Sequence, residues 1–497
     1  MTSAVGVKRL GLGAISSLPI ESRPLVRPDE IGSGIVHLGL GAFHRAHQAV
    51  FTEEAISAGG GDWGIIGVAP RSTGVFDRMR AQDNLFSVTT LGAHTSRTRV
   101  IGSLSEVRHA ASDPAAIVAL LADPRIRVVT LTVTEKAYQL DPVTGELLAD
   151  EAVAADLNTD RPPQTVPGLL IRGLLARAAA DAGPLTLLSC DNLPSNGRRT
   201  HGLIGAGLAF GGFTGAPADW IHHNVTFPNS MVDRIVPAAT PETLATAARA
   251  LGVEDQAAIA AEPYTQWVIE DRFPGGRPAW EQAGAIMTDD AGQWERLKLR
   301  TLNGVHSALA YLGALAGKET IADALALPGM EGTLRRLIAE DIAESFRPPE
   351  GVSVVGYGDD VLARFANPVI LYRTHQVAMD GTQKLPQRLL HTILDLRAAK
   401  GDARWATLAV AAWMRFVQGT ADDGTALPLN DPLADRIRTA LADTSSEPAA
   451  VVDALLHIDS VFPAALVADD EVRASITSWL TELTRHGAAA TVEAAGT

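Results

Sequence analysis

The sequence is poor in the residues from which disulfides and metal centres are built. Its 497 residues include one cysteine, Cys190, which excludes an intramolecular disulfide and any zinc or iron–sulfur site made from cysteines. His222 and His223 are adjacent, so their side chains would diverge on a helix or a strand, and they predict no metal site. We therefore expect chemistry that needs no bound metal.

Positive charge and long apolar runs are also scarce. The 42 Lys and Arg are outnumbered by 57 Asp and Glu, and the formal net charge of −15 makes nucleic acid and anionic membranes poor partners. No apolar run approaches the ~18 residues of a membrane span. No signal-peptide cleavage site follows Lys8 and Arg9. These absences predict a cytoplasmic protein, and its length suggests an enzyme.

The composition that remains is that of a folded chain, 46% hydrophobic and 20% charged. Its first half alternates short β-branched runs with helical patterns, which predicts βαβ units and a mostly parallel sheet with helices on both faces. Strands are expected at 35–38, 64–68, 85–90, 127–134 and 185–190, and helices at 44–57 and 166–181.

The second half changes character near Thr288. Nearly every segment from there on has a 3.6-residue period, which is typical of an all-helical domain. Helices are expected at 289–315, 332–345, 384–399, 402–417 and 470–485. The chain is therefore predicted to have two domains, an α/β domain over residues 1–287 and an all-α domain over residues 288–497.

A glycine pair follows the first expected strand. Gly39-Leu40-Gly41 stands where a Rossmann fold has its pyrophosphate-binding loop. We therefore predict that the first domain is of the Rossmann type. The third position of the glycine fingerprint is His44, so an ordinary strand-to-helix turn is an alternative on this pattern alone. The second expected strand is not followed by the Asp or Glu that usually binds the ribose hydroxyls of NAD. Arg71 and Ser72 stand there instead and could face a 2′-phosphate, which leaves NAD and NADP open.

One helix of the second half mixes polar and apolar side chains on a single face. At about 100° per residue, Glu295 lies about 60° from Lys298, and His306 about 80° from it. Asn303 follows at about 140°, and Leu302 in the same sector predicts that this face is buried. Burial would favour a lysine that exchanges protons. The alternative is a lysine that extends to solvent and forms a salt bridge with Glu295.

Motifs spread over residues 37 to 388 resemble, in one order, those of the polyol-specific long-chain dehydrogenase/reductase family, the mannitol dehydrogenase family. The motifs are GLGAFHRAHQ at 39–48, TVTEK at 132–136, SCDNLPSNG at 189–197, FPNSMVDR at 227–234, EP at 262–263 with QWVIED at 266–271, KLRTLNGVH at 298–306 and DGTQKLP at 380–386. The family has histidine at the third fingerprint position, which favours residues 39–41 as a cofactor loop.

The resemblance implies a metal-independent oxidoreductase that uses NAD(H), with NADP as the alternative. By motif, Lys298 is the expected acid/base, and Asn192 and Asn303 are the amides that polarise the reacting oxygen. Glu295 is a carboxylate that connects the lysine to solvent. The expected substrate contacts are His306, Asp233, Arg373, Lys384 and Lys136, and the expected cofactor contacts are Gly39, Gly41, Ala42, Phe43, His44, Arg71 and Glu135. The family includes monomers, so the resemblance implies no dimer.

Two segments bear on the substrate. Polyol members carry a Thr-Glu-Gly-Gly-Tyr version of 134–138, whereas uronate members resemble the Thr-Glu-Lys version found here, and 383–388 is also similar to the uronate branch. The resemblance therefore implies oxidoreduction between D-fructuronate and D-mannonate, with Lys136 as one cation for the carboxylate. Lys136 could instead pair only with Glu135.

Two other functions remain open. A neutral polyol such as mannitol, arabinitol or sorbitol is the alternative substrate. A non-catalytic NAD-binding regulator is disfavoured because the chain keeps the full set of proton-transfer and substrate residues, Lys298, Asn192, Asn303 and His306.

Overall fold

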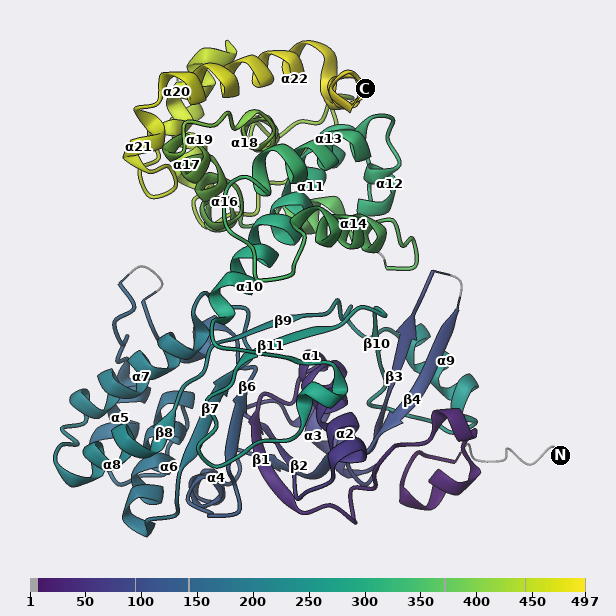
Figure 1. The fold of residues 1–497 in the computed structure, drawn as a ribbon, viewed down its shortest axis with the longest axis vertical. Helices are drawn as coiled ribbons and strands as arrows, with labels where there is room; N and C mark the ends of the chain where they lie inside the picture. Colours follow the sequence, from purple (N-terminus) through teal and green to yellow (C-terminus); the bar gives the residue numbers. More distant parts are fainter. Residues whose placement is uncertain (1–7, 94, 142–143, 371, 443, 497) are drawn as a thin grey trace. The chain divides into compact units, whose positions relative to one another are not determined.

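The computed structural model describes residues 8–93, 95–141, 144–370, 372–442 and 444–496 (Figure 1). The chain divides into two compact units, unit 1 (Met1–Gly292) and unit 2 (Gln293–Thr497). The sequence predicts the boundary at 287/288, which lies within the last strand of unit 1, β12 (Ile286–Thr288). The structure divides five residues later, within the helix α10 (Ala291–Leu297).

Unit 1 is built around a six-stranded sheet whose paired strands all run parallel. In spatial order the strands are β5 (Leu104–His109), β2 (Gly64–Ala69), β1 (Ser33–Leu38), β6 (Val128–Leu131), β7 (Leu185–Ser189) and β8 (Val225–Thr226). Numbered by their order in the chain, these strands follow the 3-2-1-4-5-6 arrangement of a Rossmann fold. The predicted fold class is confirmed for this unit, and the order reverses between β1 and β6.

The sheet separates two hydrophobic cores. Ile35 on β1 and Ile65 on β2 pack in one core, whereas their neighbours Val36 and Ile66 pack in the other, because successive strand residues point to opposite faces. The helical segments of unit 1 are η1 (Leu12–Ser17), η2 (Ile20–Ser22), α1 (Ala42–Ala46), α2 (Gln48–Gly59), α3 (Thr73–Arg80), α4 (Pro114–Leu121), η3 (Glu135–Tyr138), α5 (Glu151–Asn158), α6 (Val166–Ala180), α7 (Asn196–Phe210), α8 (Ala216–Asn224), α9 (Pro241–Leu251) and η4 (Trp280–Ala283). Helices α1 to α3 contribute to the first core and α4 to α8 to the second.

Two smaller sheets complete unit 1, and they correct the strand prediction. The expected strand 85–90 exists as β3 (Phe86–Leu91), but it pairs antiparallel with β4 (Ser96–Ile101) and parallel with β10 (Ile259–Ala261), outside the main sheet. β3 ends at Leu91 and β4 begins at Ser96, and so short a connection can join antiparallel strands but cannot form a parallel crossover. The other sheet contains β12, β11 (Gln266–Glu270) and β9 (Ser230–Asp233).

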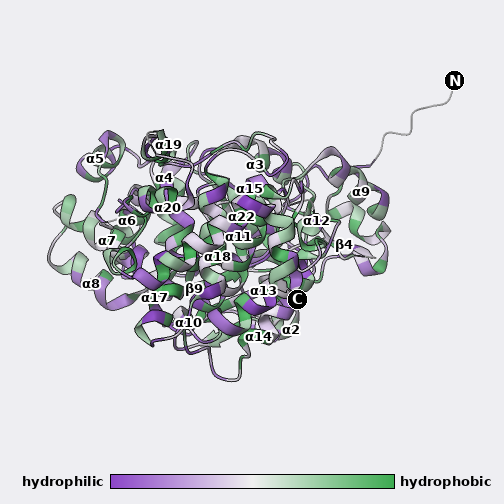
Figure 2. Cartoon of the chain, turned by 90° about the horizontal axis from the view of Figure 1, so that it is seen from above, coloured by the Kyte–Doolittle hydropathy of each residue, from purple (hydrophilic) through white to green (hydrophobic). Residues whose placement is uncertain are grey.

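Unit 2 is helical, as predicted. Its elements after α10 are η5 (Lys298–Gly304), α11 (Val305–Leu315), α12 (Ile321–Leu325), α13 (Met330–Arg336), η6 (Leu337–Ile342), α14 (Val354–Phe365), α15 (Thr374–Ala378), α16 (Gly381–Leu385), η7 (Pro386–Leu390), α17 (His391–Ala398), α18 (Arg404–Phe416), α19 (Ala434–Ala442), α20 (Pro448–Leu456), α21 (Ala464–Val467) and α22 (Asp470–Gly496). Helices α11 and α18 pack together in the hydrophobic core of the unit, and green, apolar residues are frequent around their labels in Figure 2.

Three segments of unit 2 are π-helical, namely η5, η6 and η7. They interrupt the helices that the sequence predicts at 289–315, 332–345 and 384–399. A π-helix closes its hydrogen bonds from residue i to i+5 instead of i+4, and such segments occur frequently at functional sites.

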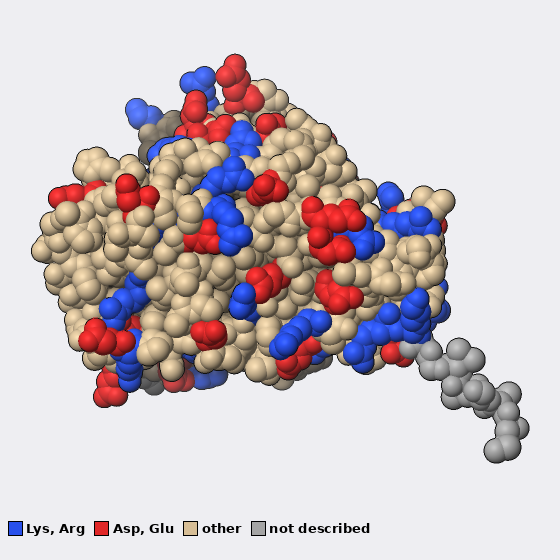
Figure 3. All heavy atoms as spheres, turned by 90° about the horizontal axis from the view of Figure 1, so that it is seen from below, with Lys and Arg blue, Asp and Glu red and all other residues tan. Residues whose placement is uncertain are grey.

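Across the described residues, no helix combines the length and apolarity that crossing a membrane requires. On the face seen in Figure 3, Lys and Arg side chains are interspersed with Asp and Glu, so that face has no extended tract of one charge.

Candidate functional site

The loop after β1 makes a turn that only glycine fits. Gly39 has φ +114°, its N–H donates to the Val68 carbonyl at 2.9 Å, and its carbonyl accepts from the Gly41 N–H at 2.6 Å. A Cβ at Gly39 would lie 2.1 Å from the carbonyl oxygen of Thr132. The turn therefore lies against β6, at the carboxyl end of the sheet, where the strand order reverses.

Gly41, by contrast, borders open space. A Cβ placed there would have Gly39 O, 4.0 Å away, as its nearest neighbour. Gly41 is exposed and precedes α1, whose first N–H groups donate to no capping side chain among the described residues. Ala42 and Phe43 are half-buried beside it. Open space beside Gly41 and free N–H groups at the start of α1 would let the backbone contact a ligand. Such a loop fits the pyrophosphate of a dinucleotide.

His44 supports this loop from inside. Its ring is fully buried and stacks on His37, with 3.4 Å between ring centroids. His37 Nε2 lies 2.9 Å from the Gly39 carbonyl oxygen and 2.8 Å from the Thr132 hydroxyl. Burial lowers the pKa of His37 to about 3 and that of His44 well below its usual range, so both rings are neutral. The side chain of His44 therefore packs in the interior and does not itself face the open side of the loop. The supporting role of His37 was not predicted from the sequence.

Other expected cofactor contacts lie at the ends of neighbouring strands. Arg71 is exposed just after β2, where residues 69–72 contain no acid, and its carbonyl lies 3.0 Å from His109 Nε2. Glu135 and Lys136 are exposed on η3, after β6. Within the described residues these two side chains form no ion pair with each other, so Lys136 is available to solvent.

A buried carboxylate that the sequence analysis missed shapes the β6–η3 turn. Asp191 accepts hydrogen bonds from the Val133 N–H at 3.1 Å and the Thr134 N–H at 2.9 Å, and from the Tyr138 hydroxyl at 2.8 Å. Burial raises the pKa of Asp191. Thr134 is held at φ +70°. Asp191 therefore orders the turn that presents Glu135, and its position next to the motif residue Asn192 was the one signal in the sequence.

Asn192 and Asp233 are placed by a second network. Asn192 is exposed after β7, and Asp233 is buried at the end of β9. The Asn196 amide donates to the Asp191 carbonyl at 3.1 Å and to the Ser230 carbonyl at 2.8 Å, and its oxygen accepts from the Ser230 N–H at 2.9 Å. These bonds tie the loop that carries Asn192 to the first residue of β9.

In unit 2, the expected acid/base lysine begins the π-helix η5. Lys298 and Asn303 are each 7% exposed. α-Helical geometry would separate them by about 140° around the axis, but π-helical hydrogen bonding links residue i to i+5. The two side chains are five residues apart and consequently lie on one face. The helical-wheel prediction is wrong in geometry, because it assumed α-helix throughout. Glu295 is half-buried on α10.

His306, near the start of α11, has an unsatisfied ring nitrogen. Its Nε2 is buried and has no hydrogen-bond partner among the described residues. The ring stacks on Phe365, with 4.5 Å between centroids. Burial and the nearby Arg388 and Lys384 lower the pKa of His306 to about 3, so the imidazole is neutral. A ligand hydroxyl could pair with this nitrogen.

Arg388 is a cation that the motif analysis did not single out. A Cβ at Gly304 would lie 2.8 Å from the Arg388 carbonyl, so η5 and η7 approach closely. The Arg388 guanidinium donates to the Ser307 hydroxyl at 3.0 Å and the Asn303 carbonyl at 3.4 Å. Neither partner is an anion. Burial lowers the pKa of Arg388 to about 10. Its presence in the segment 383–388 was the available sequence signal.

The two remaining expected substrate contacts already have partners. Arg373 is an exposed side chain that forms an ion pair with Glu319. The Lys384 ammonium donates to the carbonyls of Met379 and Val377 and lies 3.9 Å from Asp380 Oδ2. Burial lowers the pKa of Lys384 to about 8.

No metal centre emerges from these side chains. Searching the described residues finds no cluster of three or more His, Cys, Asp or Glu that could hold a metal ion. The thiol of Cys190 is buried, and burial raises its pKa.

Both units match models of one family. Residues 33–282 match the mannitol dehydrogenase Rossmann domain, and residues 290–484 match the mannitol dehydrogenase C-terminal domain. The chain belongs to the mannitol dehydrogenase family. It is therefore an oxidoreductase of the kind that acts on CH–OH groups, and the predicted resemblance is confirmed.

Relatives in the mannitol dehydrogenase family carry different substrate names. The chain is 43% identical over 438 residues to an uncharacterized oxidoreductase, YeiQ, of Escherichia coli, covering 87% of this chain and 88% of that protein. It is 39% identical over 478 residues to E. coli D-mannonate oxidoreductase, covering 95% and 97%. A solved structure, Pseudomonas fluorescens mannitol 2-dehydrogenase with NAD and D-mannitol, is 34% identical with a TM-score of 0.83, covering 98% of this chain and 99% of that one.

Proposed function

We propose that this enzyme interconverts D-fructuronate and D-mannonate with NAD(H), by a metal-independent mechanism in which Lys298 is the acid/base. The observation that carries the choice of a sugar acid is Arg388. Its guanidinium lies against η5, the segment of Lys298 and Asn303, and donates to a carbonyl and a hydroxyl. Among the residues that the structure describes, no carboxylate pairs with it. A planar guanidinium is suited to paired hydrogen bonds with a carboxylate, a group that a neutral polyol lacks.

The relatives support this choice without deciding it. The 39% identity to a D-mannonate oxidoreductase spans 97% of that protein, whereas identity to a mannitol 2-dehydrogenase of Pyrenophora tritici-repentis is 35% over 84% of it. The Thr-Glu-Lys sequence at 134–136 points the same way, and exposed Lys136 would add a second cation. Reduction or oxidation of a neutral polyol is the second candidate, favoured by the structural match to a mannitol complex.

The dinucleotide would be held by the loop after β1. Gly39 makes the turn, Gly41 leaves room for the phosphates, and the backbone of 42–44 supplies N–H donors. Arg71 and Glu135 flank the loop at the ends of β2 and β6. NAD(H), when bound, supplies or accepts the hydride. Because residues 69–72 contain no acid, NADP(H) is the alternative cofactor.

The chain's own residues would manage the proton and the charge on oxygen. In reduction, the Lys298 ammonium gives a proton to the substrate oxygen, and in oxidation the neutral amine takes it back. By the family motifs, the amides of Asn192 in unit 1 and of Asn303 in unit 2 would each donate a hydrogen bond to a substrate oxygen as it gains alkoxide character. Glu295 connects the lysine to solvent. No Lewis-acid metal is needed for these roles.

Other side chains would bind the remaining hydroxyls and the carboxylate of the sugar. His306 Nε2, which no described residue hydrogen-bonds, would accept a hydrogen bond from a substrate hydroxyl or donate one to it. Asp233 would bind another hydroxyl, and Lys384, Arg373 and Lys136 are further expected contacts. Since Arg373 is paired with Glu319, we assign the carboxylate first to Arg388.

The test is a substrate panel. NADH oxidation would be followed by absorbance with D-fructuronate, D-tagaturonate, D-fructose and fructose 6-phosphate, and repeated with NADPH. We expect D-fructuronate to give the highest kcat/KM. Preference for fructose with no turnover of either uronate would overturn the sugar-acid assignment and leave the neutral polyol reading. Faster reaction with NADPH would overturn the choice of NAD.

A further inference from the structure

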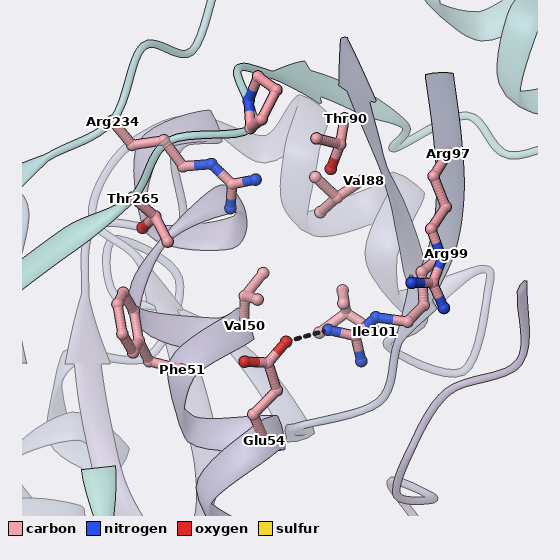
Figure 4. A pocket seen from close by; sticks show the side chains of 11 residues that line it. Val50, Phe51, Glu54, Val88, Thr90, Arg97, Arg99, Ile101, Arg234 and Thr265 are labelled. Atoms are coloured by element: carbon pink, nitrogen blue, oxygen red, sulfur yellow. Dashed lines mark hydrogen bonds and ion pairs between the residues drawn. The ribbon is translucent and has the colours of Figure 1, made fainter. Parts of the chain in front are cut away.

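Unit 1 contains a cationic cavity that the proposed reaction does not use. It has a volume of about 220 Å³ and lies between α2, the β3–β4 hairpin and the connection from β10 to β11 (Figure 4). Its polar lining consists of three arginines, one carboxylate and two threonines, namely Arg97, Arg99, Arg234, Glu54, Thr90 and Thr265. None of these residues belongs to the dinucleotide loop or to the residues assigned to the substrate.

The hairpin brings two of the arginines to one surface. Arg97 and Arg99 are two residues apart on β4, so they share a face of the strand. Across the hairpin, Thr90 pairs with Arg97, and Val88 pairs with Arg99. This quartet forms one wall, which is polar at the Arg97 end. In Figure 4, both guanidinium groups extend from β4 beside the cavity.

Arg99 has its charge compensated within the protein. It forms ion pairs with Glu53 and with Glu54, the latter at 2.7 Å. Its side chain is 15% exposed. Arg99 is therefore a fixed part of the wall and is not the group that awaits an anion.

Arg234 and Arg97 instead donate to backbone carbonyls, and the charges of Glu262 and Glu54 only partly offset the burial of Arg234. The Arg234 guanidinium donates to the Glu262 carbonyl at 3.1 and 3.2 Å and to the Ala46 carbonyl. Arg97 reaches the Glu21 carbonyl at 3.5 Å. Within the described part of the chain, neither forms an ion pair with a carboxylate. Figure 4 shows Arg234 pointing into the cavity from the side opposite Arg97.

Three guanidinium groups and one carboxylate, that of Glu54, line the cavity, so the lining is net positive in a protein whose net charge is −15. Arg97 is exposed, whereas burial lowers the pKa of Arg234 to about 10, so a bound anion would offset a desolvation cost chiefly at Arg234. The volume, about 220 Å³, corresponds to about seven waters at ~30 Å³ each. It suits a group of a few heavy atoms and excludes a nucleotide.

We propose that this cavity is a binding site for a small oxyanion, the phosphate or carboxylate group of a metabolite, separate from the catalytic residues. Arg97 and Arg234 would clasp the oxyanion from two sides, and the Thr90 and Thr265 hydroxyls would donate further hydrogen bonds. The site would therefore let the level of an anionic metabolite affect the stability of unit 1 through β4 and α2.

The experiment measures anion binding directly. Inorganic phosphate and malonate would each be titrated by calorimetry into the protein saturated with NADH, so that the pyrophosphate loop is occupied. Arg97→Gln and Arg234→Gln each remove one charge from the cavity. Arg80→Gln, an exposed arginine at the end of α3, makes the same change elsewhere on unit 1. Arg388→Gln reports whether the anion binds in unit 2 instead.

We expect saturable binding of at least one anion, weakened about tenfold or more by Arg97→Gln and by Arg234→Gln, and unchanged in Arg80→Gln and Arg388→Gln. Binding of phosphate alone would identify a phosphorylated ligand, and binding of malonate alone a carboxylated one. The proposal would be overturned if neither anion showed saturable binding, or if Arg97→Gln bound the anion as tightly as the wild type. Loss of affinity in Arg388→Gln alone would assign the binding to the substrate residues. If Arg234→Gln does not fold, the exposed Arg97 still decides the outcome.

Discussion

Alanine substitutions at Gly39 and Gly41 are expected to have opposite effects on stability and on NADH binding, and comparing them tests the cofactor site. Gly39 has φ +114°, and its added Cβ would lie 2.1 Å from the backbone oxygen of Thr132, the residue after β6. Gly41 has φ −79°, and its added Cβ would meet nothing closer than 4.0 Å. Alanine at position 39 therefore disturbs the fold itself, whereas alanine at position 41 fills only the space left for a ligand.

The magnitudes follow from the backbone and the clash. Gly39→Ala costs about 1–3 kcal/mol for the backbone conformation and about 1–3 kcal/mol more for overpacking against Thr132. At about 2–4 °C per kcal/mol for a unit of this size, its Tm should fall by about 4 °C or more. Gly41→Ala should keep its Tm within about 2 °C, because its φ suits alanine, but should weaken NADH binding about tenfold or more through the lost close approach of the backbone.

Thermal unfolding and a titration of NADH fluorescence measure both effects on the same samples. Gly39→Ala serves as the matched control, since it makes the same substitution two residues away. Wild-type NADH affinity in Gly41→Ala would refute the reasoning that this space receives the cofactor. An unchanged Tm in Gly39→Ala would refute the described turn.

Three further predictions address the acid/base, the substrate and the effect of pH. Lys298→Ala should still bind NADH but lose about 10²–10⁴-fold in kcat, and near wild-type turnover would remove Lys298 from the mechanism. Lys136→Gly should raise KM for D-fructuronate more than KM for D-fructose, whereas equal effects would mean that Lys136 does not read the carboxylate. Burial raises the pKa of Glu53 to about 7, above the unfolded value of about 4.3, so its contribution to stability is full below about pH 4 and is lost as pH rises through about 7. Tm measured from pH 5 to pH 8 should therefore fall less steeply in Glu53→Gln than in the wild type, and parallel curves would contradict this.

The parallel sheet could be predicted where its strands are central. β1, β2, β6 and β7 are buried and read as β-branched or apolar runs, and the glycine pair after β1 marks the nucleotide loop. β5 was not predicted, because it lies at the edge of the sheet and contains the polar residues Glu106 and Arg108. Periodicity detects burial, so an edge strand with exposed polar residues gives little signal.

The candidate site was predictable in its residues but not in its geometry. Lys298 and Asn303 stand out by residue type, yet a seven-residue π-helix differs from an α-helix by too little to show in a periodic pattern. The Asp191 network links residues 53 to 58 positions apart, and no local rule predicts such contacts. Arg388 is one arginine among many in the sequence, and only its approach to the Asn303 carbonyl gives it significance.

The central claim is that Arg388 reads the carboxylate of a sugar acid. Its most direct test is the ratio of kcat/KM for D-fructuronate to kcat/KM for D-fructose, compared between the wild type and Arg388→Met. Loss of a charge-assisted pair worth about 1.5–3 kcal/mol predicts that this ratio falls about tenfold or more, with fructose turnover little changed. A ratio equal to that of the wild type would contradict the assignment.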